Sequence, residues 1–146
     1  MDTNCFIDAT KDDAANAAFE LFTSAAAPRL HLSSVVAAEL RAGTFDPAER
    51  GQLEEGVVEP YKRRARIVTP SAAAWSALGD TLATLVKDEG LDLKTVKRSF
   101  VFDILVAYSC REIGAIFVSA NIRDLDRIAR VFAFDYLAPY PDLATI

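Results

Sequence analysis

Short segments rich in β-branched and aromatic residues alternate along the chain with longer segments of helical periodicity, and this alternation limits the fold more than any single motif. Strands are predicted at 29–33, 66–70, 115–120 and 134–140, and helices at 11–27, 35–43, 72–88, 92–114 and 122–132. Residues 45–65 are predicted to be helical with interruptions at Gly51, Gly56 and Pro60. Tight hairpin signals are lacking in the sequence, so the pattern predicts an α/β fold with helices on both faces of a parallel sheet.

Residues with known preferences for helix ends support these boundaries. Ser33 or Ser34 is placed to cap the helix over 35–43, which Gly43 ends. Ser71 is placed to cap the helix over 72–88, and Gly114 ends the long helix over 92–114.

The length of 146 residues suits one domain, predicted to span 1–146, and a hydrophobic fraction of 51% is enough for a core. We expect a soluble cytoplasmic protein, because the sequence shows neither a signal-peptide pattern nor an apolar run of the ~20 residues that span a membrane. The net charge of −5 argues against bulk electrostatic coating of nucleic acid, but not against a local basic groove. Cys5 and Cys110 lack a CxxC spacing and are predicted to be buried reduced thiols.

The chain has a single histidine, His31, between two leucines of a predicted strand. Histidine-based acid–base catalysis, Ser-His-Asp triads and His-rich zinc sites are therefore disfavoured, and we interpret His31 as an ordinary strand residue. The sequence also contains no GxGxxG or GxxxxGK[ST] loop for binding phosphates. Any chemistry must therefore rely chiefly on carboxylates.

Asp103 is the only charged residue in the segment FVFDILVAY (100–108), which lies in a predicted helix that is apolar almost all the way round. Burial of an isolated ionised carboxylate is costly or raises its pKa. One interpretation places Asp103 in a cleft with a cation or an arginine. The other is an aspartate at a helix edge that pairs with a basic neighbour.

Three other carboxylates follow predicted strands or lie in the next helix, at the edge where parallel sheets bind ligands. Glu39 lies about one turn into its helix, although the nearby Arg41 also suits a surface position. Asp124 lies in the first turn of its helix, where it would also stabilise the helix dipole. Asp2 comes just before Asn4, which would also serve as an ordinary helix cap. With Asp103, these carboxylates form an oxygen-rich set suited to Mg²⁺ or Mn²⁺, ions that support phosphodiester cleavage.

Several segments, in this order, resemble the PIN domain and in particular the VapC-type ribonuclease toxins of type II toxin–antitoxin pairs. They are DTN at 2–4, SSVVAAEL at 33–40, FDILVAYS at 102–109 and VSANIRDLDRIA at 118–129, with FDYLAPYP at 134–141 resembling the final strand. The resemblance covers essentially the whole chain. It implies a three-layer α/β/α fold around a central, mostly parallel sheet of about four to five strands.

The resemblance also implies roles for individual residues. The family uses four acidic residues to bind metal and cleave RNA. The positions that match them in this sequence are Asp2, Glu39, Asp103 and Asp124. Ser119 and Asn121 match the polar pair beside the fourth acid, and Asn4 matches the residue that braces the first. The implied protein is a Mg²⁺- or Mn²⁺-dependent endoribonuclease, acting on an RNA such as tRNA or rRNA, that forms a homodimer and binds a cognate antitoxin.

The sequence leaves two questions open, namely which residue is the fourth acid and whether two basic runs contact RNA. Asp126 is the alternative to Asp124 as the fourth acid, although the two lie roughly 200° apart around the helix. Two basic runs are predicted to guide RNA, with a solvated helix end as the alternative for each residue. They are Lys62, Arg63, Arg64 and Arg66 within YKRRAR (61–66), and Lys97 and Arg98 within LKTVKR (93–98).

The main alternative function is a PIN-like module that binds RNA or protein without useful catalysis. A metal-dependent phosphatase of another α/β family is disfavoured, because Asn4 stands where that family needs a second aspartate. In the PIN family several apolar residues form a central strand before the first aspartate, whereas only Met1 precedes Asp2 here. We therefore expect a truncated first strand and a natural start a few codons upstream.

Overall fold

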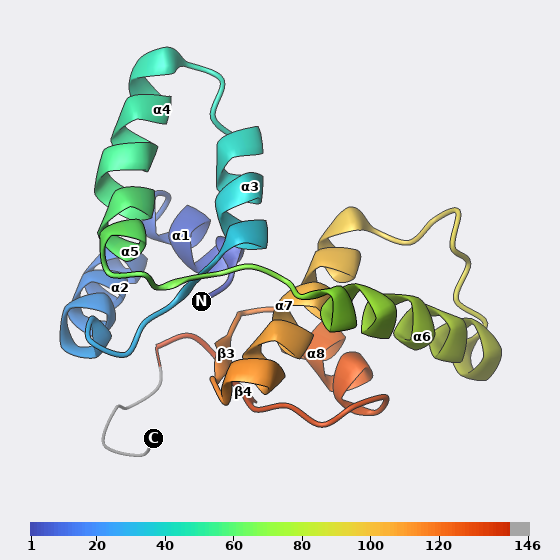
Figure 1. Ribbon diagram of the computed structural model, residues 1–146. Coiled ribbons are helices and arrows are strands. Elements are labelled where there is room, and N and C mark those ends of the chain that lie inside the picture. The colour runs from blue at the N-terminus through green and yellow to red at the C-terminus, as the bar shows by residue number, and fades with distance from the viewer. Residues whose placement is uncertain (141–146) are drawn as a thin grey trace.

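A computed structural model of the chain describes residues 1–140, in which helices surround two short pairs of strands (Figure 1). The helices are α1 (Thr3–Ala9), α2 (Asp13–Ala26), α3 (Ser34–Ala42), α4 (Pro47–Leu53), the π-helix η1 (Glu54–Val58), α5 (Glu59–Arg63), α6 (Ala72–Glu89), α7 (Arg98–Ile113) and α8 (Ile122–Ala129). In Figure 1, α3 and α4 run side by side at one end of the molecule, and α6 lies at the other. Pro141, at the end of the 134–141 segment, and the predicted domain boundary at residue 146 lie outside the described residues.

All four strands of the described residues pair in parallel. β1 (Leu32–Ser33) pairs with β2 (Ile67–Val68), and β3 (Phe117–Val118) pairs with β4 (Tyr136–Leu137). The predicted α/β class with parallel strands is therefore confirmed, although the strands form two separate pairs rather than one sheet. The backbone N–H of Asp2 donates to the carbonyl of Val118 at 2.9 Å, so the chain beside β3 contributes one strand-like contact before α1 begins.

The predicted helix ends are largely confirmed. Ser33, rather than Ser34, caps α3 by accepting a hydrogen bond from the backbone N–H of Val35, and Gly43 follows its last residue. Ser71 caps α6, and Gly114 ends α7 with a φ of 63°, a left-handed conformation that glycine adopts readily.

Three predictions about helices are wrong. Residues 92–97 precede α7 instead of belonging to it, because Asp92 accepts hydrogen bonds from Lys94 and Thr95 in a local turn that competes with the helix. Helix α1 was not expected at all. The interruption predicted at Gly51 is also wrong, because Gly51 lies inside α4, whereas those at Gly56 and Pro60 coincide with the π-helix η1 and with the start of α5.

The glycines and the proline of this region fit within the helices for simple reasons. Gly51 lies inside α4, where the cost of glycine is only about 1 kcal/mol. Gly56 lies in the π-helical turn η1, and Pro60 lies in the first turn of α5, where a missing N–H costs little.

Helix α7 lies at the centre of the core, which explains why it is apolar on nearly every side. Ile104, Leu105 and Ala107 are completely buried, and they pack in one cluster with Phe117 of β3 and Leu125 of α8. Complete burial of such side chains contributes about 1.5–3 kcal/mol each. Asp103, in the middle of this helix, is therefore buried.

Both cysteines are free, as predicted, but only Cys5 is buried, and Cys110 is partly exposed. Burial raises the pKa of both the Cys5 and the Cys110 thiol to about 11. Within residues 1–140, the helices are too short or too polar to cross a membrane.

Candidate functional site

Asp2 is the N-terminal cap of α1 and is held by three donors. One carboxylate oxygen accepts from the backbone N–H of Thr3 at 2.7 Å. The other accepts from Nδ2 of Asn4 and from the hydroxyl of Ser119, each at 2.7 Å. Ser119 comes directly after β3, so the carboxyl end of that strand and the start of α1 fix the buried Asp2 side chain together.

Asn121 joins two further acids of the predicted quartet. Its Nδ2 donates to Oδ2 of Asp103 at 2.9 Å and to Oδ2 of Asp124 at 2.7 Å. Its backbone N–H donates to the Ser119 hydroxyl at 3.0 Å. Three of the four predicted acids, Asp2 included, therefore belong to one hydrogen-bonded network beyond the end of β3.

Glu39 enters this network through a residue that the sequence analysis did not identify. The hydroxyl of Thr3 donates to Oε2 of Glu39 at 2.6 Å, which links α3 to the start of α1. The available signal was a hydroxyl residue directly after a candidate metal-binding aspartate, but its partner lies 36 positions away in sequence.

The electrostatics of Asp103 show that the acids interact. Its side chain is only 5% exposed, and burial is the main cause that raises its pKa to about 8. The negative charges of Asp2, Asp124 and Glu39 raise it further, while the hydrogen bond from Asn121 acts in the opposite direction. Asp103 is therefore mostly protonated at neutral pH while no cation is bound.

The donor chemistry of the site suits a hard divalent cation, since the side chains present carboxylate, hydroxyl and amide oxygens. Within residues 1–140, however, no group of three or more His, Cys, Asp or Glu side chains is already arranged to hold a metal ion. The Asn121 amide lies between Asp103 and Asp124 and contacts only Oδ2 of each, so the other carboxylate oxygen of each does not contact this amide.

Asp126, the alternative fourth acid, lies elsewhere. It is exposed and accepts a hydrogen bond at 2.7 Å from the hydroxyl of Tyr136, whereas Asp124 contacts Asn121. His31 is also exposed, with Nδ1 3.2 Å from the carbonyl of Arg29. The geometry thus favours Asp124 over Asp126 and leaves His31 outside the network.

Three of the four basic side chains in the first run, at 62–66, contact other groups of the protein. Lys62 and Arg63 pair with Glu59 at 2.8 and 3.8 Å, and Arg66 donates to the carbonyl of Ala27 at 2.7 Å. Arg64 is exposed. These partners leave less of the run to contact a nucleic acid than the sequence suggested.

The second basic run lies at the start of α7, the helix that carries Asp103. Lys97 and Arg98 are exposed, and the guanidinium of Arg98 lies 5.8 Å from the centre of the Phe102 ring. A helix rises 1.5 Å per residue, so Arg98 is about 8 Å from Asp103 along the axis. Five residues also turn the helix by about 140°, so Arg98 and Asp103 leave α7 on different sides.

Fold and site together define an α/β domain with an acidic site beyond the carboxyl ends of parallel strands. The PIN domain family model matches residues 1–131, and the chain belongs to this family. PIN domains are generally nucleases that bind divalent metals.

A solved structure of FitAB bound to an IR36 DNA fragment resembles the chain with a TM-score of 0.69 and 13% sequence identity. The likeness covers 97% of this chain and 95% of that one, and it supports the three-layer α/β/α fold. A comparison with curated proteins finds no match.

Proposed function

We propose that this protein is a metal-dependent endoribonuclease of the VapC type, the toxin of a toxin–antitoxin pair. The observation that carries the proposal is the buried Asp103 carboxyl, whose pKa is raised to about 8 by burial and by Asp2, Asp124 and Glu39. A set of acids that repel one another in this way is relieved by a bound cation. The PIN family match over residues 1–131 supports nuclease chemistry for the chain.

In this proposal Asp2, Glu39, Asp103 and Asp124 hold Mg²⁺ or Mn²⁺. When bound, the cation supplies Lewis acidity that lowers the pKa of a water molecule and stabilises negative charge on the scissile phosphate. Asp103 gives up its carboxyl proton to become a ligand, which makes cation binding release protons.

The neighbouring polar groups orient the acids. Asn4 and Ser119 hold Asp2, and Thr3 holds Glu39. Asn121 donates to both Asp103 and Asp124 and would orient them toward a cation.

RNA approaches the site along the start of α7, where Lys97 and Arg98 contact its phosphates. This path is preferred to the run at Lys62–Arg66, where Glu59 and the Ala27 carbonyl already bind three of the basic side chains. A local path also agrees with the net charge of −5, because the whole surface does not attract nucleic acid.

The proposal includes the remaining properties implied by the resemblance to VapC-type toxins. The chain forms one PIN domain over 1–146, acts in the cytoplasm as a homodimer, and binds a cognate antitoxin. The structural neighbour FitAB is bound to DNA, which supports a nucleic-acid context for this fold.

The test is RNA cleavage by the purified protein with Mg²⁺, with Mn²⁺ and with a chelator. We expect cleavage only with the metals, and loss of cleavage in Asp103→Asn. Asp126→Asn is the matched control, since Asp126 is an exposed acid outside the network. Metal-dependent cleavage by Asp103→Asn at the wild-type rate would contradict the assigned site, and RNA binding without cleavage would favour a non-catalytic module.

A further inference from the structure

Arg127 of α8 contacts both of the long helices beside it. Its Nε donates to Oε2 of Glu89 at 2.9 Å, and its Nη2 lies 2.8 Å from the same oxygen. Glu89 is the last residue of α6. The guanidinium also lies 4.8 Å from the centre of the Phe100 ring, which is within range of a cation–π contact. Phe100 is buried near the start of α7, so one side chain joins α6, α7 and α8.

Phe100 and Arg127 are neighbours of two acids of the network. Phe100 lies three residues before Asp103 on α7, and Arg127 lies three residues after Asp124 on α8. Residues that are three apart lie on the same side of a helix, about one turn from each other. The Asn121 amide connects the two acids themselves. Two side-chain connections between α7 and α8 therefore lie close together, one of them through the acids.

The contacts of Arg127 are more directional than the other contacts of α8. Leu125 and Ile128 are completely buried, but apolar burial has no preferred direction and does not by itself set the rotation of a helix. A guanidinium is planar, so it pairs and stacks in a defined orientation. The Arg127 side chain is 27% exposed, and ion pairs within reach of solvent contribute little to stability. Its main effect should therefore be on geometry.

The pairing with Glu89 also decides where the charge of Arg127 lies. Asp124 precedes Arg127 by three residues, a spacing at which opposite charges pair on a helix. Within residues 1–140, however, Arg127 pairs with Glu89, and Asp124 accepts from Asn121. The Asp124 carboxylate is therefore not neutralised by the arginine on its own helix.

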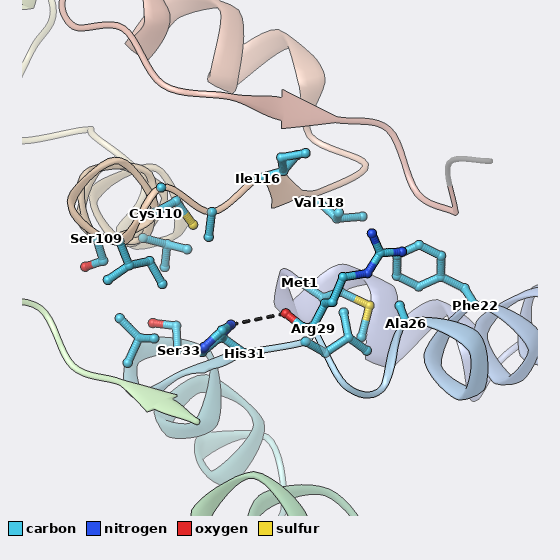
Figure 2. A pocket seen from close by; sticks show the side chains of 16 residues that line it. Met1, Phe22, Ala26, Arg29, His31, Ser33, Ser109, Cys110, Ile116 and Val118 are labelled. Atoms are coloured by element: carbon cyan, nitrogen blue, oxygen red, sulfur yellow. Dashed lines mark hydrogen bonds between the residues drawn. The ribbon is translucent and has the colours of Figure 1, made fainter. Parts of the chain in front are cut away.

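The strand side of α7 offers less support than the side of α6 and α8. Ser109 and Cys110 line a cavity of about 310 Å³ between the two strand pairs (Figure 2). Arg127, Glu89 and Phe100 do not line this cavity. Because α7 packs against less protein on the cavity side, its contacts with α6 and α8 do more to fix its position.

We propose that Arg127 is a positioning residue, which sets the separation of Asp103 and Asp124 while Glu89 holds its guanidinium in place. This role rests on the proposed function, in which both acids bind the cation. Arg127 acts through α8 and does not itself contact the cation or RNA. Its loss should therefore change the affinity for the cation and the environment of the Asn121 amide more than it changes stability.

The experiment compares wild type with Arg127→Met, which keeps an unbranched side chain but removes the guanidinium. Arg130→Met is the matched control, because Arg130 is 71% exposed and lies 3.6 Å from Glu89 as well. Binding of Mn²⁺ is measured by electron paramagnetic resonance, and the side-chain amide signals of Asn121 are measured by NMR in the metal-free protein. Thermal unfolding reports on the fold. Arg127→Lys and Glu89→Ala/Arg127→Met complete the set.

Arg127→Met is expected to weaken Mn²⁺ binding by about tenfold or more and to shift the Asn121 amide signals. Its unfolding temperature should change by no more than about 4 °C. Arg127→Lys should be intermediate, and Arg130→Met should match wild type. The double variant should bind Mn²⁺ as weakly as Arg127→Met and no more weakly, because Glu89 acts through Arg127.

Wild-type Mn²⁺ affinity and wild-type amide signals in Arg127→Met would overturn the inference and leave the proposed function intact. An equal loss of affinity in Arg130→Met would also overturn it, as would a loss of stability with unchanged Mn²⁺ binding. A wild-type chain that binds no Mn²⁺ would contradict the proposed function. The Asn121 amide signals of the metal-free variants would then decide the inference on their own.

Discussion

Asp103→Asn should stabilise the metal-free protein at neutral pH while it removes activity. Asparagine has the same shape as aspartate and keeps an oxygen to accept the 2.9 Å hydrogen bond from Asn121. It removes only the charge that the buried site disfavours. The variant therefore gains stability when it loses the active-site carboxylate, whereas most substitutions of buried residues lower the stability.

The magnitude follows from the pKa of Asp103, which rises from 3.8 to about 8 on folding. Below about pH 4 the carboxyl is protonated in both the folded and the unfolded chain, so it has no effect on stability. As the pH rises toward 8, the unfolded chain releases the proton first, and the folded state loses stability until both forms are ionised. Near pH 7 the linkage relation gives a loss of about 4 kcal/mol, which Asp103→Asn recovers.

The assay is urea unfolding of wild type and Asp103→Asn in chelator over a series of pH values. With a typical slope of about 2 kcal/mol per molar urea, the variant midpoint should lie about 2 M higher near pH 7 and coincide with wild type near pH 4. Added Mg²⁺ should stabilise wild type more than the variant. A difference between the two proteins that stays constant from pH 4 to 8 would refute the reasoning.

Four further predictions concern other residues. Asn121→Ala should reduce metal-dependent cleavage by about 10–100-fold in a steady-state assay, because Asp103 and Asp124 lose their shared donor. Gly114→Ala should lower the free energy of unfolding by about 1 kcal/mol, since Gly114 has a φ of 63°. Gly51→Ala should raise it by about 0.5–1 kcal/mol, because Gly51 lies within α4 with open space around a new Cβ; urea unfolding tests both. The native Cys5 thiol, buried with a pKa of about 11, should resist alkylation at pH 8 until the protein unfolds, as followed by mass spectrometry.

The class of fold could be predicted from the sequence, and the burial of Asp103 was one of two interpretations of its apolar surroundings. Both rest on local patterns, namely the alternation of strand-like and helical segments and the apolar surroundings of one aspartate. Because α7 is apolar on almost every side, it had to be central, and Asp103 had to be buried with it. No comparable signal separated Asp124 from Asp126, and only the contacts of Asn121 and Tyr136 distinguish the two positions.

Helix α1 was not predicted because the reasons for its formation are mostly tertiary. Residues 3–9 are too few to fold as an isolated helix. The structure shows Asp2 capping the helix, Ser119 holding Asp2, and the Tyr140 hydroxyl donating to the carbonyl of Cys5. Ser119 and Tyr140 lie more than 100 positions from their partners in sequence, so no local pattern could reveal these two contacts.

The same long-range contacts explain how the site keeps its geometry with so little sheet around it. In a parallel α/β fold the strands normally fix the residues at their carboxyl ends, yet each strand here has two residues. The side chains of the site compensate, because Ser119 joins Asp2 to Asn121, and Thr3 joins α1 to Glu39.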